Sequence, residues 1–150
     1  MLFYDINQKS FDRQQVAMPY SKAQFLSHHQ ALQVNQSGKI FYAVDSQSAI
    51  HSVAYLIWDK KTAYYHLSGD DPALRESGAG ILLIWEAIQY ASTVLKLETF
   101  DFEGSMMLNV EPIRVQFGAT QVPYFYVWKY FSNTYFLLDQ LQALRKRKNG

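Results

Sequence analysis

An apolar run of helical period, followed directly by a short strand-like run, constrains the fold of this chain most. Glu98 to Phe102 reads as a buried strand, and the helix before it is its only route back to the sheet. A crossover of this length makes that strand parallel to the strand candidate before the helix, Thr62 to Ser68. The sequence therefore predicts an α/β fold with a mixed sheet. The apolar residues of the helical run are Ile81, Leu82, Ile84, Trp85, Ile88 and Leu95.

Further strand candidates precede that helix. Leu2 to Ile6 is predicted as a strand, and Lys39 to Val44 and Ile50 to Trp58 lead up to Thr62 to Ser68. Short polar links join the last three, which favours antiparallel hairpins.

A helix is predicted to start at Ser21. Ser21 and Gln24 have the spacing of a capping box, and Tyr20 and Phe25 occupy the two positions of a hydrophobic staple. We expect the helix to run to about Asn35. The residues expected to be buried on it are Phe25, Leu26 and Leu32.

The C-terminal third is predicted to hold two helices and a strand. A short helix is expected from Asn109 to Gly118, with Pro112 in its first turn. Val122 to Phe131 is predicted as a strand, and Ser132 or Asn133 should cap a final helix. One face of the strand would carry a row of aromatic side chains. This row would either belong to the core under that helix, wall an acceptor pocket or form a subunit interface. The row is Tyr124, Tyr126, Trp128 and Tyr130.

Composition narrows the function classes. A chain of 150 residues with 49% hydrophobic residues should bury one core as a single domain. The net charge of +1 does not indicate a nucleic-acid partner, and the absence of cysteine excludes disulfides and thiolate chemistry. The four histidines lack metal-ligand spacing, so no metal is expected. No apolar run spans a bilayer, so no membrane partner and a cytoplasmic location are predicted.

The segment Arg75 to Gly80 reads as a phosphate-binding turn between a strand and a helix. A helix N-terminus offers free backbone N–H groups, and the glycines would let the backbone approach a pyrophosphate closely. Arg75 could add a permanently charged donor. The alternative is an ordinary strand-to-helix turn with a solvated Arg75.

The pattern R-x-x-G-x-G in this setting resembles the acyl-CoA pyrophosphate loop of the GNAT N-acyltransferases, and the order of elements resembles their fold over most of the chain. The resemblance implies acetyl-CoA as co-substrate. It also implies a set of residues that hold it. These are Arg75, Ser77, Gly78, Ala79, Gly80 and, at the strand end, Leu67.

A closer likeness covers roughly residues 64–129. Phe100-Asp101-Phe102-Glu103-Gly104-Ser105 and Phe117-Gly118-Ala119 resemble segments of the GNAT-type domain related to the Fem peptidyltransferases. Such proteins are usually about twice this length, so residues 1–150 would form one GNAT-like domain that could be the C-terminal half of a longer protein. Arg114 occupies the position where that family often has Lys. Ordinary GNAT enzymes often have at this position a Tyr that acts as the general acid and protonates the departing CoA thiolate.

Candidate catalytic residues lie at the two central strand ends. Glu103 and Asp101 are the first candidates for a general base, with His66 as a third. Arg114 could stabilise the departing thiolate electrostatically. The alternative for both carboxylates is structural, as caps of the following helix or partners of Arg114.

The predicted function is acyl transfer from a CoA thioester to an amine, by direct attack in a ternary complex. The expected acceptor is a small-molecule or peptide amine, and a homodimer is possible. One alternative is a Fem-like fragment that uses aminoacyl-tRNA and acts on a cell-wall precursor. Another is a non-catalytic GNAT-like binding or dimerisation module.

Overall fold

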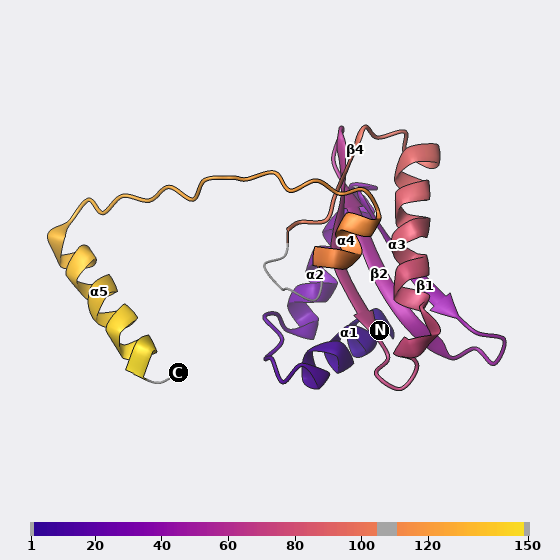
Figure 1. The fold of residues 1–150 in the computed structure, drawn as a ribbon, viewed down its shortest axis with the longest axis horizontal. Helices are drawn as coiled ribbons and strands as arrows, with labels where there is room; N and C mark the ends of the chain where they lie inside the picture. The colour runs from indigo at the N-terminus through magenta and orange to yellow at the C-terminus, as the bar shows by residue number, and fades with distance from the viewer. Residues whose placement is uncertain (1, 105–110, 149–150) are drawn as a thin grey trace. The chain divides into compact units, whose positions relative to one another are not determined.

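The computed structural model describes residues 2–104 and 111–148, with the side chains of the last helix up to Leu144 (Figure 1). The chain divides into two compact units, Met1–Ala119 and Thr120–Gly150. The first unit holds the sheet and all residues predicted for the site.

The first element, α1 (Leu2–Arg13), is a helix, so the predicted strand at Leu2 to Ile6 is wrong. Its buried side chains recur at helical spacing, and two of them are polar. Asn7 is buried because its Nδ2 donates to the backbone oxygen of Ser68 at 2.6 Å. The buried set on α1 is Phe3, Tyr4, Ile6, Asn7 and Ser10.

The second helix, α2 (Lys22–Val34), confirms the predicted capping box. Ser21 Oγ accepts from the Gln24 backbone N–H at 3.3 Å, and Gln24 Oε1 accepts from the Ser21 N–H at 2.8 Å. Phe25 is buried as predicted, and Leu32 is half-buried. The predicted burial of Leu26 is wrong, since this side chain is 42% exposed.

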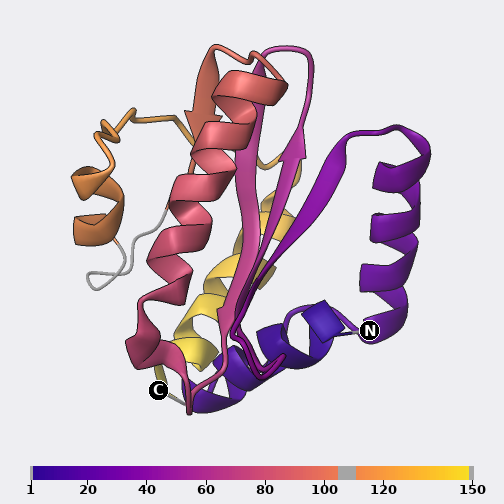
Figure 2. The ribbon, with the colours of Figure 1, turned by 90° about the vertical axis from the view of Figure 1, so that its right-hand side faces the viewer.

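A mixed sheet of four strands follows, in the order β1-β2-β3-β4. The three antiparallel-linked strands and the parallel fourth strand confirm the predicted topology. Helices α1 and α2 lie on one face and α3 on the other (Figure 2). The strands are β1 (Gly38–Val44), β2 (Ile50–Trp58), β3 (Thr62–Asp70) and β4 (Thr99–Asp101).

The predicted crossover helix is α3 (Ala79–Gln89), continued by a π-helical turn from Tyr90 to Val94. Leu83, Ala87 and Ala91 pack against the sheet. Other apolar residues of the predicted run, such as Trp85, lie on the exposed side of the helix. The predicted α/β mixed sheet flanked by helices is therefore confirmed.

The short helix α4 (Glu111–Gln116) lies within the predicted range, with Pro112 in its first turn. It ends before Gly118, whose φ of 81° suits a helix stop. Its predicted cap, Asn109, lies outside the described residues. The ring of Phe117, just after α4, lies 6.4 Å from the ring of Phe102, just after β4. This contact places the end of α4 beside the end of β4.

The second unit contains α5 (Asn133–Lys148), which begins where predicted. Ser132 Oγ accepts from the Thr134 backbone N–H at 3.2 Å. The predicted strand Val122 to Phe131 is wrong: it pairs with no strand in the described part of the chain, and its predicted aromatic core residues Tyr124, Tyr126 and Trp128 are exposed. Strand propensity depends on a partner and a packing surface, which the sequence does not show.

Candidate functional site

A β-bulge in β3 sets the orientation of His66. Tyr55 of β2 pairs with Leu67, and Leu56 pairs with Tyr65, so His66 has no partner in this register. The extra residue also moves Leu67 onto the face covered by α1 and α2, whereas Tyr65 faces α3. Bulges of this kind often redirect side chains beside functional sites.

The parallel strands β3 and β4 are paired only over a short stretch. The pairing ends at Tyr64 and Asp101, and His66 and Glu103 each lie two residues further along. Nδ1 of His66 lies 3.0 Å from Oε1 and 3.1 Å from Oε2 of Glu103. An ionised carboxylate only accepts hydrogen bonds, so Nδ1 donates, and in the neutral ring Nε2 then carries the lone pair. The structure thus joins two of the three predicted base candidates.

The third candidate, Asp101, forms the turn that presents Glu103. Its Oδ1 accepts from the backbone N–H of Glu103 at 2.7 Å. Glu103 has a φ of 55°, and Gly104 follows with 62°. A left-handed conformation at a non-glycine residue costs energy and is common at functional sites. Asp101 therefore has a structural contact, and a catalytic role for it stays a prediction.

His66 lines a pocket of about 360 Å³, which we call the aromatic pocket. The ring of His28 lies 5.3 Å from that of His66. Partial burial, together with the charges of His66 and His29, lowers the pKa of His28 below its usual 6.5, so this ring is neutral near pH 7. The lining residues are Tyr20, Gln24, Phe25, His28, His66 and Leu67.

Tyr20 is held in place at the wall of this pocket. Its hydroxyl donates to Oδ1 of Asn7, whose amide in turn holds the Ser68 carbonyl of β3. Burial, with a smaller effect of Tyr4, raises the pKa of Tyr20 to about 12. The hydroxyl is therefore protonated at neutral pH, and its polar end is turned toward the protein.

Arg114 brings a positive charge close to the His66–Glu103 pair. Its guanidinium lies 5.6 Å from the centre of the Phe102 ring. Burial lowers the pKa of Arg114 below its usual range, although Tyr65, Asp101 and Glu103 act in the opposite direction. The group remains a cation. Its buried Nη1 has no hydrogen-bond partner among the residues that the structure describes, which leaves a donor for an anionic atom.

The predicted phosphate turn leads directly into the N-terminus of α3. Arg75 to Ser77 form one 3₁₀ turn, and Gly78 has a φ of 74° with open space around its Cα. Ile81 and Leu82 donate to the Gly78 carbonyl, and the N–H of Ala79, at the start of α3, donates to Oγ of Ser77 at 3.4 Å. The exposed Arg75 and this helix N-terminus fit an anion.

The surroundings of this turn include a groove and a carboxylate. An open groove of about 490 Å³ between β1 and α3 reaches Ser77, Gly78 and Ala79. A Cβ at Gly80 would lie 2.8 Å from Oδ1 of Asp70, so a side chain there would require the Asp70 carboxylate to shift.

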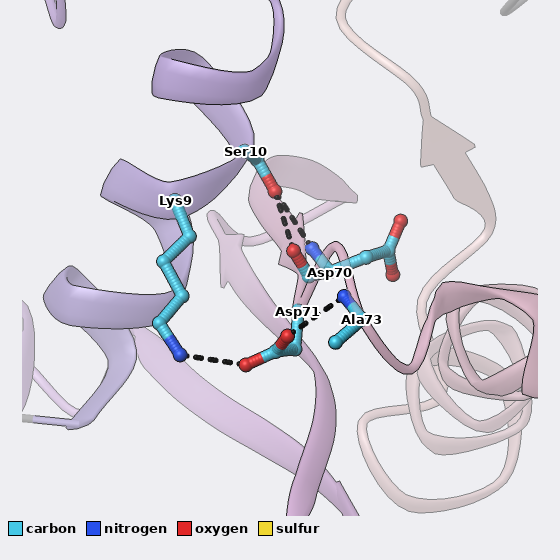
Figure 3. Close-up of polar contacts among 5 residues, drawn as sticks. All are labelled: Lys9, Ser10, Asp70, Asp71 and Ala73. Atoms are coloured by element: carbon cyan, nitrogen blue, oxygen red, sulfur yellow. Dashed lines mark hydrogen bonds and ion pairs between the residues drawn. The ribbon is translucent and has the colours of Figure 1, made fainter.

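The loop before the turn is anchored to α1 (Figure 3). Ser10 Oγ donates to the Asp70 carbonyl at 3.0 Å and lies 2.8 Å from the Asp70 N–H, which donates to it. Lys9 pairs with Asp71 at 2.6 Å, and Asp71 also accepts from the Ala73 N–H at 3.0 Å. The chain that leads from β3 to the glycine turn therefore begins at a fixed point.

Sequence reasoning missed the pocket wall that α2 provides. Gln24, Phe25 and His28 lie at spacings that place them on one side of a helix, next to the staple residue Tyr20. That spacing could have indicated a shared helix face. It did not indicate which side of the sheet α2 covers, so the pocket wall could not be predicted from it. Within residues 2–104 and 111–148, no three His, Asp or Glu side chains lie close enough to hold a metal ion.

Comparisons with known proteins agree with this fold. Residues 1–107 match the family described as Acetyltransferase (GNAT) domain. A search of curated protein sequences found no significant match. Among the described residues, no helix is long and apolar enough to cross a membrane.

Several solved structures share the fold at low sequence identity. A putative acetyltransferase from Agrobacterium tumefaciens is 13% identical, with a TM-score of 0.64 over 85% of this chain and 93% of that chain. The aminoglycoside 6'-N-acetyltransferase from Acinetobacter haemolyticus is 13% identical, with a TM-score of 0.58 over 83% and 91%. A point mutant of the spermidine N-acetyltransferase from Vibrio cholerae is 17% identical, with a TM-score of 0.54 over 77% and 70%.

Proposed function

This chain belongs to the acetyltransferase (GNAT) domain family and is an N-acetyltransferase, and from that premise we propose its reaction and its residues. The reaction is transfer of an acetyl group from acetyl-CoA to an amine nitrogen, by direct attack in a ternary complex. The His66–Glu103 pair supports this proposal most strongly, because it lies beyond the last pairing of two parallel strands and because His66 lines a pocket.

His66 acts as the general base in this proposal. An amine is largely protonated at neutral pH and must lose a proton before its lone pair can attack a carbonyl carbon. Nε2 of His66 accepts that proton, and the Glu103 carboxylate stabilises the imidazolium through Nδ1. Acetyl-CoA supplies the acetyl thioester, so that a C–N bond forms as the C–S bond breaks.

Arg114 stabilises negative charge as the reaction proceeds. Its unpartnered Nη1 can donate to the carbonyl oxygen or to the departing sulfur. A fixed, partly buried cation stabilises developing charge more effectively than water does. This role replaces the Tyr acid that ordinary GNAT enzymes often have at this position.

The glycine turn holds the CoA pyrophosphate in this proposal. Arg75 contributes charge, and Gly78 and Gly80 let the backbone at the start of α3 approach the phosphates. The Ala79 N–H donates to Oγ of Ser77 at 3.4 Å, and on binding it would exchange that hydroxyl for a phosphate oxygen. Leu67, near the end of the neighbouring strand β3, provides an apolar contact to acetyl-CoA. Its side chain lines the aromatic pocket. Holding both substrates in one geometry supplies much of the catalytic effect.

The absence of cysteine makes the test direct. A thiol reagent added to the purified chain with acetyl-CoA and an amine detects only the CoA thiol that is released. We expect amine-dependent release that His66→Gln lowers by about a hundredfold, within the usual range for a general base. Release that is independent of added amine, or equal in His66→Gln, contradicts the proposal.

Two alternatives use the same fold. The non-catalytic binding or dimerisation module is favoured by the exposed aromatic side chains of residues 124–128, which would suit a homodimer interface. The Fem-like, aminoacyl-tRNA-dependent fragment is favoured by the segment from Phe100 to Gly104 and by Phe117-Gly118-Ala119, while the net charge of +1 argues against tRNA contacts. A cytoplasmic location and a single domain also stay predictions.

A further inference from the structure

We infer that the acceptor is a monoamine with an aromatic body, such as an arylalkylamine, and that its ring occupies the aromatic pocket. This inference rests on the proposed acetyl transfer and adds the substrate class. The pocket of about 360 Å³ lies at the small end of the range for ligand sites and has room for a ring with a short chain.

The pocket wall consists of rings in fixed positions. The rings of Tyr20 and Phe25 are stacked with centroids 6.4 Å apart, and Phe25 also stacks on Phe3 at 5.1 Å. Phe25 is 3% exposed, so its position is set by the core. Since the hydroxyl of Tyr20 donates to Asn7, its ring is the part available to a ligand. Fixed aromatic faces favour a flat apolar group over a flexible polar one.

The charges of the pocket favour an acceptor with a single amine. None of its six lining residues is Asp, Glu, Lys or Arg. The neighbouring carboxylate, Glu103, already accepts from His66. One ammonium group can enter because it gives its proton to His66, and aromatic faces attract a cation before that step. A second ammonium group would lose water without gaining a carboxylate partner, which is costly.

Gln24 offers a way to change this preference. It lines the pocket from the first turn of α2, and its Oε1 accepts from the Ser21 N–H at 2.8 Å. Glutamate at this position keeps that capping contact, because the capping box accepts Glu or Gln equally. Gln24→Glu therefore adds a carboxylate to the pocket with little change in folding.

The experiment compares 2-phenylethylamine, hexylamine and spermidine as acceptors, measured as CoA release by the full chain. We expect kcat/KM for 2-phenylethylamine to exceed that for spermidine by about tenfold or more, with hexylamine between them. In Gln24→Glu the ratio of spermidine to 2-phenylethylamine should rise by about tenfold. Gln30→Glu, on the same helix but outside the pocket, is the control and should leave the ratio unchanged.

The outcomes separate this inference from the proposed function. Turnover of spermidine or hexylamine that equals or exceeds that of 2-phenylethylamine overturns the inference and leaves acetyl transfer intact. If no amine is turned over, calorimetric titration with 2-phenylethylamine decides. Saturable binding that Tyr20→Leu weakens supports the pocket assignment, and no binding overturns it. If the chain neither binds acetyl-CoA nor turns over any amine, both the proposed function and this inference are overturned.

Discussion

Nδ1 of His66 donates to the carboxylate of Glu103 at 3.0 Å, across the gap where β3 and β4 cease to pair. Each partner is presented by a local irregularity. His66 lies at a bulge in β3, and Glu103 lies in a left-handed turn that Asp101 stabilises. Two backbone irregularities that converge on one hydrogen bond support our proposal that this pair is the centre of the site.

Replacement of Glu103 by Gln should impair catalysis without impairing the fold. The variant loses the negative charge that stabilises the His66 imidazolium, so we expect kcat/KM to fall by about tenfold to a hundredfold, with a shifted pH profile. The side chain is partly exposed, so the melting temperature should change little. Steady-state CoA release across a range of pH measures the effect.

Asp101→Asn is the matched control for this prediction. The amide oxygen of Asn can still accept from the Glu103 N–H and keep the turn. We expect activity within a factor of about three of the wild type, since no group that reacts is removed. A loss as large as that of Glu103→Gln would show that Asp101 takes part in the chemistry.

Arg75→Ala should weaken binding of acetyl-CoA. A ligand at about 100 times its Kd adds about 2.7 kcal/mol of stability, and a tenfold weaker Kd reduces this to about 1.4 kcal/mol at the same concentration. The thermal shift caused by acetyl-CoA should therefore fall to about half, while the melting temperature without ligand stays the same because Arg75 is exposed. Lys60→Ala, another exposed cation, should keep the full shift. If acetyl-CoA shifts the melting temperature equally in the wild type and both variants, Arg75 does not contribute to the binding site.

The hairpin strands and the crossover were predictable because their patterns are local. Apolar strand-like runs, the short polar links between them and the helical run before Glu98 define the sheet without knowledge of distant contacts. The first helix was not predictable in this way. Its buried face includes Asn7 and Ser10, which are buried only because Ser68 and Asp70 of β3 supply hydrogen-bond partners. A pattern that counts only apolar residues misses such a face.

The site was predictable as a set of residue types and less so as a geometry. The positions of Glu103 and His66 follow from the ends of two neighbouring strands, so both were candidates. Their direct contact depends on the bulge at His66, which leaves no signal in the sequence. The predicted strand Val122 to Phe131 shows the same limit, because β propensity describes a surface that a partner must provide.

Gly69→Ala should destabilise the fold through a steric clash. A Cβ at Gly69 would lie 2.7 Å from the Asn7 Cα, so α1 would have to move away from β3. We expect the free energy of unfolding to fall by about 1–3 kcal/mol or more, as for other overpacked positions. Gly118→Ala serves as comparison, since its φ of 81° strains alanine but the space around it is open. That variant should lose only about 1 kcal/mol. Urea unfolding measures both, and equal losses would contradict the close packing of α1.

The folded protein should lose stability in mild acid because of His28. Partial burial and the neighbouring His66 and His29 lower the pKa of His28 in the folded state below its usual 6.5. The unfolded chain therefore binds more protons than the folded chain as the pH falls past this value, so protonation favours unfolding. Urea unfolding from about pH 7 to about pH 5 should show a smaller loss of stability for His28→Gln than for the wild type. Gln30→Ala, on the same helix, should keep the wild-type slope. If His28→Gln also keeps it, the crowding of His28 against His66 does not affect the protein's proton balance.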